Sequence, residues 1–320
     1  MELSFIVVNW NSLTYLRKCI ASIYAQTKCS FEVVVVDNAS PTGEASVIAR
    51  EFPQITLIQC TENIGFGAAN NLGFQRSVGD NLLFLNPDTE LLNSAGDIMI
   101  RTLSADRCAG VIGCTLLNED RSIQTSCIQT FPTILNQLLD SDWLRVRWPN
   151  SHLWGTEPLW SKRVGAAQVE VISGACMLMR REVFEEVGGF TEAYFMYAED
   201  LDLCYKIQKA GYSNYYLSSP TVLHYGGKSS NPEQATPMKW RSIIIFCERH
   251  HGHAYAVAFR FAIACASLVR LIVLTGTRAP MGILRNRTPD SAALTKWKLI
   301  LHTMLGSSGR LRPVSQPTAR

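Results

Sequence analysis

The residues best suited to chemistry follow the apolar run Asn81–Leu85, in the sequence Asn86-Pro87-Asp88. An apolar run of this length is typical of a strand buried on both faces. Pro87 cannot extend a sheet ladder, and it holds the preceding residue in an extended conformation. Asp88 therefore follows the carboxyl end of a buried strand, the edge where open α/β sheets bind ligands. A carboxylate there suits a divalent cation that holds phosphate oxygens, although an ordinary Asn-Pro-Asp turn explains the same residues.

Three carboxylates at the start of a predicted helix form a second group. Asp202 and Lys206 are spaced i, i+4, so a salt bridge explains Asp202. The helix macrodipole also favours carboxylates in a first turn. Glu199 and Asp200 follow an aromatic stretch, however, and a carboxylate beside an apolar approach is suited to act as a general base.

Polar residues also end the first two predicted strands, with Asn9 after the first and Asp37 after the second. The Asp37 carboxylate could accept hydrogen bonds from a base or a ribose, and an Asx-turn explains it equally well. The loop from Asn63 through Gly65 to Asn70 opens a helix, where small residues and the helix N-terminus favour an anion. It matches neither the G-x-G-x-x-G fingerprint nor a Walker A loop, and a helix start without a ligand is the alternative.

Two further positions combine small residues with a strand. Gly174 lies in an apolar run, where a glycine permits the close approach of a sugar or of another backbone segment. His224 ends a short strand and is followed, after Tyr225, by two glycines, which suits a metal ligand or a phosphate loop. An isolated histidine is also common as a structural residue, so the residues alone leave both interpretations open.

The elements that must position these residues alternate between strand and helix in the first half of the chain. Repeated βα units predict an α/β fold with a mainly parallel, doubly wound sheet. Residues 118–170 lose this pattern and are rich in Trp and Pro, so we expect an excursion beside the site and not a separate domain. The body is predicted to end near residue 237. Predicted strands span residues 3–9, 31–36, 55–59, 81–85, 108–114, 173–179, 213–217 and 221–223, and predicted helices span residues 44–52, 63–78, 94–104, 180–187 and 199–210.

Composition excludes several classes of protein. The chain has 320 residues, of which 47% are hydrophobic, so general disorder is excluded. Its ten cysteines include no C-x-x-C pair, which indicates reduced thiols of a cytoplasmic protein and not a disulfide framework or a zinc site. Residues 1–6 enter a strand without a basic stretch, so no signal peptide is expected.

The net charge of +3 hides a strong asymmetry. Residues 1–238 contain 17 Lys and Arg against 25 Asp and Glu, whereas residues 239–320 contain 13 against 2. This division predicts an acidic globular body and a basic C-terminal region that meets a polyanion, either nucleic acid or an anionic membrane surface. A basic region that is solvated without a partner is the alternative.

Residues 254–276 are strongly apolar but include Arg260 and Arg270. At the helical repeat, one narrow polar stripe contains Arg249, His253, Arg260 and Ser267. A spanning helix needs about 20 apolar residues without a central charge, whereas an interfacial helix accommodates such a stripe. We therefore expect the C-terminal region to dock on the cytoplasmic membrane face, with a helix packed on the body as the alternative.

Taken together, these motifs resemble the family 2 glycosyltransferases with a GT-A fold, and most closely their bacterial rhamnosyltransferase-like branch. Their order and spacing match over roughly residues 3–230, and the match beyond is loose. The matching segments are residues 5–11 (FIVVNWN), 34–40 (VVVDNAS), 63–73 (NIGFGAANNLG), 85–89 (LNPDT), 173–176 (SGAC), 199–204 (EDLDLC) and 224–227 (HYGG).

The resemblance implies a nucleotide-diphosphate sugar donor and a divalent metal, Mg²⁺ or Mn²⁺. Asp88 would be the metal-binding end of the family's Asp-x-Asp motif, and His224 would match its later metal-binding histidine. Asn86 departs from the pattern, because many members have an Asp there, so tight metal binding is in doubt. Asp200 matches the catalytic base. Residues expected to line the donor site are Asn9, Asp37, Asn63, Gly65, Asn70, Asn86, Gly174 and Glu199.

One candidate base and no obvious nucleophile favour an inverting transferase. The branch resemblance implies an activated 6-deoxyhexose donor such as dTDP-L-rhamnose, and a lipid-linked or cell-envelope glycan acceptor. The expected location is cytoplasmic, peripherally attached to the inner face of the plasma membrane, with no nucleic acid as partner. The expected division is a GT-A catalytic domain over residues 1–237 and a helical, basic region over 238–320. The alternatives are a non-catalytic glycan- or nucleotide-sugar-binding relative, and a sugar-nucleotide pyrophosphorylase, which should have a basic glycine-rich loop where residues 1–11 have none.

Overall fold

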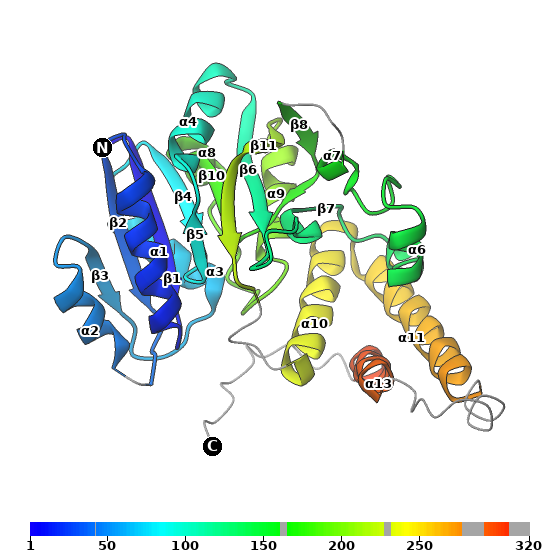
Figure 1. Ribbon diagram of the computed structural model, residues 1–320. Helices are drawn as coiled ribbons and strands as arrows, with labels where there is room; N and C mark the ends of the chain where they lie inside the picture. The colour runs from blue at the N-terminus through cyan, green and yellow to red at the C-terminus, as the bar shows by residue number, and fades with distance from the viewer. Residues whose placement is uncertain (42, 161–164, 227–231, 277–290, 307–320) are drawn as a thin grey trace. The chain divides into compact units, whose positions relative to one another are not determined.

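The computed structural model describes residues 1–41, 43–160, 165–226, 232–276 and 291–306 (Figure 1). The chain divides into two compact units. The sheet unit comprises Met1–Phe131, Arg145–Phe195 and Glu199–Ser229, and the helical unit comprises Pro132–Leu144, Met196–Ala198 and Ser230–Arg320. The domain boundary expected near residue 237 stays a prediction.

The sheet unit is built on nine strands within the described residues, in the order β3-β2-β1-β4-β10-β6-β11-β5, with β8 paired to β11. The strands are β1 (Leu3–Asn9), β2 (Phe31–Asp37), β3 (Thr56–Gln59), β4 (Asn81–Leu85), β5 (Thr89–Leu91), β6 (Ala109–Leu117), β8 (Ala166–Val169), β10 (Cys176–Arg180) and β11 (Ser213–His224). A two-stranded sheet pairs β7 (Ile128–Gln129) with β9 (Val171–Ile172).

The α/β class with a mainly parallel sheet is confirmed, since β1, β2, β3, β4, β6 and β11 run in one direction, and three antiparallel strands make the sheet mixed. Strands β1, β2, β3 and β4 pair in parallel, as does β6 with β11, whereas β5, β8 and β10 run antiparallel to their neighbours. Apolar periodicity locates a strand such as β10 but carries no information about its direction. The chain enters β10 after the long excursion, which permits either direction.

Strand direction explains why polar residues that are distant in sequence gather at one edge. Strand β10 is antiparallel to both β4 and β6, so β4 and β6 point the same way. Because β11 is parallel to β6, it also ends at the edge where β1, β2 and β4 end. The start of β10 lies at this edge as well, since Cys176 pairs with Leu85.

Helices cover both faces of the sheet (Figure 1). Helix α4 (Ala95–Ala105) packs on the face formed by Leu3 and Phe5, where an ideal Cβ on Gly96 would lie 3.2 Å from Leu3. Helix α3 (Phe66–Arg76) packs on the opposite face, where a Cβ on Gly73 would lie 2.6 Å from Ile6. Successive side chains of β1 therefore point to opposite faces of the sheet and are covered by α4 on one face and by α3 on the other. The other helices of this unit include α1 (Leu13–Gln26), α2 (Glu44–Glu51), α7 (Glu157–Trp160), α8 (Arg181–Glu186) and α9 (Glu199–Lys209).

One pair of predicted strands differs from the structure. Strand β11 is continuous over Ser213–His224, where two short strands were expected, and its pairing with β6 shifts register between Tyr216 and Thr221. Pro220 lies within this stretch, and it contributes to the irregular pairing because proline has no N–H to donate to a neighbouring strand. The excursion at 118–170 contains ordered pieces: η1 (Thr125–Cys127), α5 (Ile134–Leu138), α6 (Asp142–Arg147), α7 and β8.

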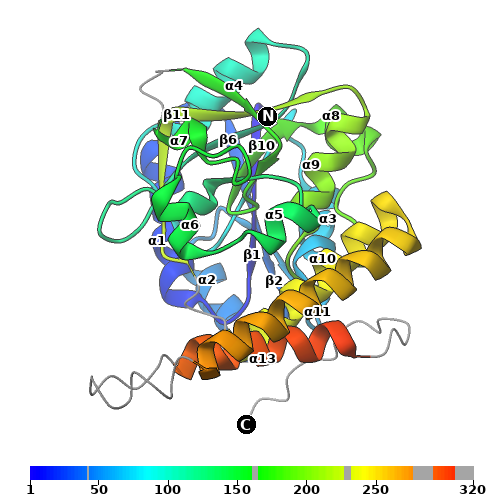
Figure 2. The same ribbon diagram turned by 90° about the vertical axis from the view of Figure 1, so that its right-hand side faces the viewer.

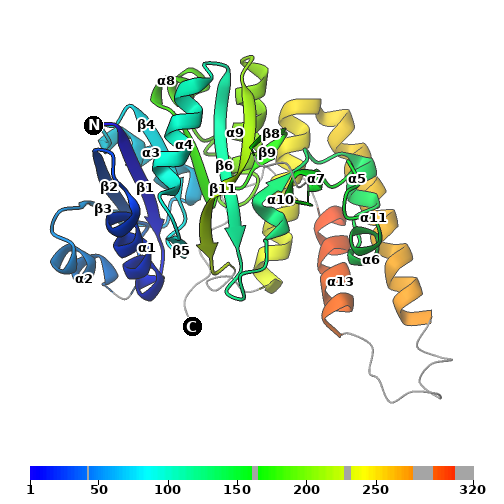
Figure 3. The same ribbon diagram turned by 45° about the horizontal axis from the view of Figure 1, so that its top comes forward.

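The helical unit is formed by α5, α10 (Pro232–His251), α11 (His253–Gly276) and α13 (Ser291–Leu305) (Figures 2 and 3). Its core contains Ile243, Cys247, Phe259, Ile263 and Ile300. Among the described helices, α11 is long and apolar enough to cross a membrane by length and composition.

Of the polar stripe expected from the sequence, Arg260 and Ser267 find partners within the helical unit, whereas Arg249 and His253 are exposed. Ser267 is fully buried and donates to the Ile263 carbonyl. The Arg260 guanidinium donates to the Met304 carbonyl at 2.7 Å, at the C-terminal end of α13. Arg260 and Ser267 therefore donate to backbone carbonyls, and the interfacial role expected for this helix stays a prediction.

Candidate functional site

Asp88 and His224 meet because β5 pairs with β11. The register places Thr89 opposite His224, and the Tyr225 amide donates to the Asp88 carbonyl at 2.9 Å. His224 Nε2 lies 3.4 Å from Asp88 Oδ1, and both side chains are 14% exposed. Asn86 Nδ2 also lies 3.4 Å from His224 Nε2. The motif residue after β4 and the histidine after β11 thus form one cluster.

Gln124 completes this cluster and was not predicted from the sequence. Its side chain contacts the His224 ring at 2.8 Å and the His224 carbonyl at 2.6 Å. No pattern of residue types in the irregular stretch at 118–170 indicates such a contact. A cavity of about 510 Å³ opens beside the cluster, and it is lined by Asn118, Ile123, Gln124, Thr125, Ser126, His224, Tyr225 and Gly226.

The cluster has the donor set of a weak divalent metal site. Asp88 Oδ1 and His224 Nε2 are separated by 3.4 Å, which matches two ligands that each bind one ion at about 2.1 Å. Asn86 offers an amide oxygen after rotation of its side chain. In the described part of the chain, no group of three or more His, Cys, Asp and Glu side chains is placed to hold a metal. The residues therefore fit an ion whose remaining positions are filled by water and phosphate oxygens.

Asn9 and Asp37 lie in a buried polar network at the same sheet edge. The Asn9 amide donates to Asp37 Oδ1 and to Glu44 Oε2, each at 2.9 Å. Ser40 Oγ donates to Asp37 Oδ1 at 2.6 Å, and the Ser40 amide donates to Asp37 Oδ2 at 3.3 Å, so the carboxylate also holds the turn after β2. Asn9 Oδ1 is buried without a hydrogen-bond partner. Such an unsatisfied oxygen costs free energy and marks a place where a ligand donor could bind.

Glu44 was not anticipated in this network. It is buried in the first turn of α2, and it accepts from the Ser12 amide at 3.0 Å as well as from Asn9. A glutamate at a helix start is ordinarily explained by the macrodipole, so its type and position give no signal of burial.

The glycine loop packs against the chain and not into open space. Gly65 has φ +87°, and a Cβ there would lie 2.6 Å from the Phe195 carbonyl oxygen. The Phe66 amide donates to that same oxygen at 2.8 Å. Asn63 Oδ1 accepts from the Gly65 amide at 3.0 Å. Asn70 is buried and donates to the Phe66 carbonyl at 3.0 Å. The roles expected for these residues in donor binding stay predictions.

Asp200 is held by two backbone amides. Gly174 N–H donates to Asp200 Oδ2 at 3.0 Å, and Leu201 N–H donates to Asp200 Oδ1 at 2.8 Å. A Cβ on Gly174 would lie 3.4 Å from the Asp200 Cβ, so glycine permits this close approach. The sequence predicted both residues as site members, and the structure brings them into direct contact.

Glu199 is buried beside Asp200, and its Oε2 atom has no hydrogen-bond partner. Burial, and then the neighbouring charge of Asp200, raises the pKa of the Glu199 carboxyl to about 8. Near neutral pH Glu199 is therefore mainly protonated. Asp200 is only partly buried, so it is the carboxylate of this pair that an acceptor hydroxyl could reach and that could act as a general base.

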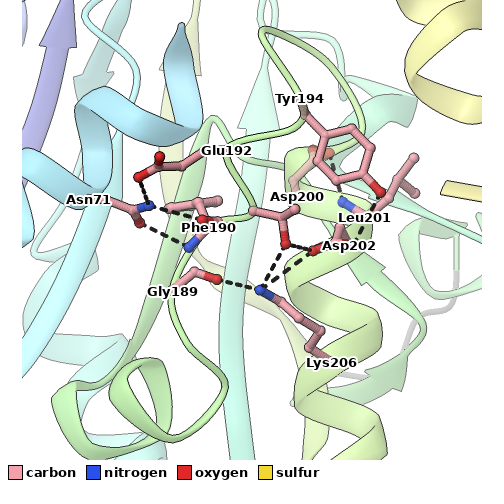
Figure 4. Close-up of polar contacts among 10 residues, drawn as sticks. Asn71, Gly189, Phe190, Glu192, Tyr194, Asp200, Leu201, Asp202 and Lys206 are labelled. Atoms are coloured by element: carbon pink, nitrogen blue, oxygen red, sulfur yellow. Dashed lines mark hydrogen bonds and ion pairs between the residues drawn. The ribbon is translucent and has the colours of Figure 1, made fainter. Parts of the chain in front are cut away.

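Asp202 serves the fold. It is fully buried and accepts from Thr191 Oγ1 at 2.6 Å and from the Tyr194 hydroxyl at 3.1 Å. Lys206 Nζ lies 3.5 Å from Asp202, which confirms the i, i+4 salt bridge expected from the sequence. Figure 4 shows this network, in which Lys206 also donates to the Gly189 carbonyl.

The fold and the site define a class. A mixed α/β sheet gathers an Asp and a His after β4 and β11, an Asp after β2 and a helix-start Asp at one edge, and this is the GT-A arrangement of nucleotide-sugar glycosyltransferases. The model of glycosyl transferase family 2 matches residues 4–188, and a model of glycosyl transferase family 21 matches residues 159–286. The chain belongs to glycosyl transferase family 2 and is a glycosyltransferase.

Characterised relatives are named as rhamnosyltransferases. The N-acetylglucosaminyl-diphospho-decaprenol L-rhamnosyltransferase of Mycobacterium tuberculosis is 29% identical over 270 residues, which covers 78% of this chain and 85% of that protein. The rhamnosyltransferase WbbL of Escherichia coli is 25% identical over 245 residues, which covers 73% of this chain and 88% of that protein.

Solved structures confirm the fold. A mannosyltransferase from Pyrobaculum calidifontis, in complex with GDP-Man and Mn²⁺, superposes with a TM-score of 0.60 at 18% identity, covering 94% of this chain and 85% of that one. GalNAc-T7 with UDP, GalNAc and Mn²⁺ gives a TM-score of 0.55 at 15% identity, covering 79% of this chain and 51% of that one.

Proposed function

We propose that this protein is an inverting transferase that moves L-rhamnose or a related hexose from a nucleotide-diphosphate donor to a hydroxyl of a lipid-linked or cell-envelope glycan. The observation that carries this proposal is the meeting of Asp88 with His224, 3.4 Å apart, at the edge that also holds Asp37. The name of the Mycobacterium tuberculosis relative supports the donor sugar and the lipid diphosphate acceptor.

Asp200 is the proposed general base. Its two amide hydrogen bonds fix the carboxylate and favour its charged form, ready to take a proton from the acceptor hydroxyl. The acceptor oxygen then attacks the anomeric carbon from the face opposite the nucleotide, which inverts that centre. A group positioned in this way contributes about 10²–10⁴ in rate.

Asp88 and His224, with the amide oxygen of Asn86, would hold Mg²⁺ or Mn²⁺. The bound ion would supply charge that neutralises the departing diphosphate. The proposed donor-binding residues are Asn9, Asp37, Asn63, Gly65, Asn70, Asn86, Gly174 and Glu199. The proposed division is a catalytic domain over residues 1–237 and a membrane-associating region over 238–320.

Helix α11 supports a peripheral membrane location on the cytoplasmic face. One face of α11 exposes apolar side chains and Cys265 at helical spacing, with Thr275 at its C-terminal end. Arg260 faces α13, and Arg270 donates to the carbonyls of Leu138 and Asp140 and stacks on Trp297 at 4.2 Å. A helix that lies in the interface buries such a face, whereas spanning would bring both arginines into the hydrocarbon. The exposed apolar residues are Val257, Phe261, Leu268, Val269, Ile272 and Val273.

The test is turnover of a panel of nucleotide sugars, including dTDP-L-rhamnose, with Mg²⁺ or Mn²⁺ and a polyprenyl-diphosphate glycan. We expect metal-dependent transfer with one donor, and a loss of about 10²–10⁴ in kcat for Asp200→Asn with unchanged donor binding by calorimetry. Asp80→Asn, at an exposed aspartate, should transfer normally. Donor binding without turnover by the wild type would identify a non-catalytic relative, and loss of donor binding in Asp200→Asn would make that residue structural.

A further inference from the structure

We propose that Gln124 is a positioning residue that fixes the tautomer of His224, so that Nε2 presents its lone pair to Asp88 and Asn86. Gln124 makes two contacts with the same histidine, one to the ring and one to the main chain. Both residues line the cavity beside the cluster.

The main-chain contact determines the orientation of the Gln124 amide. A backbone carbonyl only accepts hydrogen bonds, so the group 2.6 Å from the His224 carbonyl is the amide nitrogen Nε2. The oxygen Oε1 is then the group 2.8 Å from His224 Nδ1. An amide oxygen also only accepts, so Nδ1 carries a proton. In the neutral imidazole, Nε2 is consequently unprotonated.

A hairpin holds Gln124 in this place. The chain turns after β6, where Asn118 N–H donates to the Ser122 carbonyl at 2.8 Å. It then returns alongside β6, where Gln124 N–H donates to the Leu116 carbonyl at 2.9 Å. Strand β6 is itself paired with β11, so the segment that carries Gln124 and the strand that ends at His224 both lie beside β6.

The fixed tautomer suits a cation. His224 Nε2 and Asp88 Oδ1 are both acceptors, and they face each other at 3.4 Å. Two such groups repel unless a positive charge lies between them, and a hydrogen-bonded outer partner makes a histidine a better ligand. This consequence rests on the proposed metal site, whereas the tautomer itself does not.

The tautomer is measured by ¹⁵N NMR of the histidine rings in the full-length, metal-free protein, in alkaline buffer where imidazole is neutral. The His224→Gln variant assigns the signal by its loss. We expect a protonated Nδ1 and an unprotonated Nε2 in the wild type, and a proton on Nε2 in Gln124→Met. Gln168→Met, at an exposed glutamine of β8, should leave the spectrum unchanged. A proton on Nε2 in the wild type overturns the proposal.

A second arm measures Mn²⁺ affinity by electron paramagnetic resonance in the presence of thymidine diphosphate. We expect Gln124→Met to weaken Mn²⁺ binding about 10–100-fold, and Gln168→Met to have no effect. Gln124→Glu keeps the acceptor for Nδ1 and supplies a variant in case the methionine variant fails to fold; it should retain the Nδ1 proton. Mn²⁺ affinity that is equal in wild type and Gln124→Met, with an altered tautomer, refutes the positioning role. If the wild type shows the expected tautomer but neither it nor any variant binds Mn²⁺, the result counts against the proposed metal site and not against the Gln124 contact.

Discussion

Glu199 and Asp200 are adjacent in the chain, but their carboxyl groups lie in different hydrogen-bonding environments. Asp200 receives two amide hydrogen bonds, whereas Glu199 Oε2 is buried without a partner. Desolvation is the main cause of the raised pKa of Glu199, because it penalises the charged form. The two amide hydrogen bonds to Asp200 favour the charged form of that carboxyl, whereas burial favours the neutral form of Glu199.

This difference predicts a pH-dependent stability. The folded-state pKa of Glu199 is raised to about 8 from an ordinary value of 4.5. Between these values the folded protein binds more protons at this site than the unfolded chain, so the free energy of unfolding falls as pH rises. Glu199→Gln removes this contribution. We expect the variant to be more stable than the wild type by about 2–5 kcal/mol above pH 8, with little difference below pH 4.5.

The measurement is urea unfolding of both proteins from pH 4 to pH 9, with the free energy of unfolding extrapolated linearly to zero urea. Glu185→Gln, at an exposed glutamate of α8, is the matched control and should run parallel to the wild type. If the free energy of unfolding of the wild type does not fall relative to that of Glu199→Gln between pH 4.5 and about pH 8, Glu199 ionises normally.

Residue types predicted the carboxylate and histidine members of the proposed site but not the residues that support them. Asp88, Asp200 and His224 stand beside proline, aromatic residues or glycines, which mark special positions. Gln124 and Glu44 occupy positions whose sequence context is ordinary. Gln124 contacts His224 of β11 and Glu44 contacts Asn9 of β1, and such tertiary contacts cannot be predicted from the local sequence.

At the scale of elements, left-handed backbone clusters around the site. The non-glycine residues with positive φ in the described chain are Asn11, Ala39, Arg121, Tyr197 and Ala198. Each lies within three residues of Asn9, Asp37, Gln124 or Glu199 along the chain. Such conformations cost free energy and are retained where the surrounding structure requires them.

Ala39 offers a test of this strain at the turn after β2. Its φ is +63°, a region that β-branched residues rarely adopt. We expect Ala39→Val to lower the free energy of unfolding by about 1–3 kcal/mol. Ala39→Gly should stay within about 1 kcal/mol of the wild type, since relief of strain offsets the entropy of glycine. Urea unfolding measures both. Ala166→Val, at an exposed position of β8, is the control, and an equal loss there would remove the strain argument.

The elements themselves were largely predictable, and their pairing was not. The βα alternation over the first 114 residues follows from apolar periodicity and glycine breaks. The pairing of β5 with β11, which brings Asp88 to His224, joins segments separated by more than 130 residues. Nothing local to Thr89–Leu91 specifies that partner, because a three-residue strand carries little pattern.

At the scale of the whole molecule, charge and apolar surface are concentrated in the same part of the chain. Residues 239–320 contain 13 Lys and Arg against 2 Asp and Glu. Within the described residues, α11 exposes its apolar face while Arg260 and Arg270 are directed at backbone carbonyls. In the proposed peripheral location, apolar insertion and attraction to anionic lipid would reinforce each other.

Removing apolar contact from α11 should detach the protein from membranes. We expect the double variant Val269→Asp, Val273→Asp to bind vesicles of phosphatidylethanolamine and phosphatidylglycerol at least about 10-fold more weakly, because each buried valine contributes about 1.5 kcal/mol and each carboxylate is repelled by the surface. Val78→Asp, at a valine that is 65% exposed in the sheet unit, should bind like the wild type. Co-sedimentation at low and at high salt measures both contributions. Binding that survives the double variant would assign attachment to charge alone, and wild-type protein that resists extraction by alkaline carbonate would show that α11 spans the bilayer.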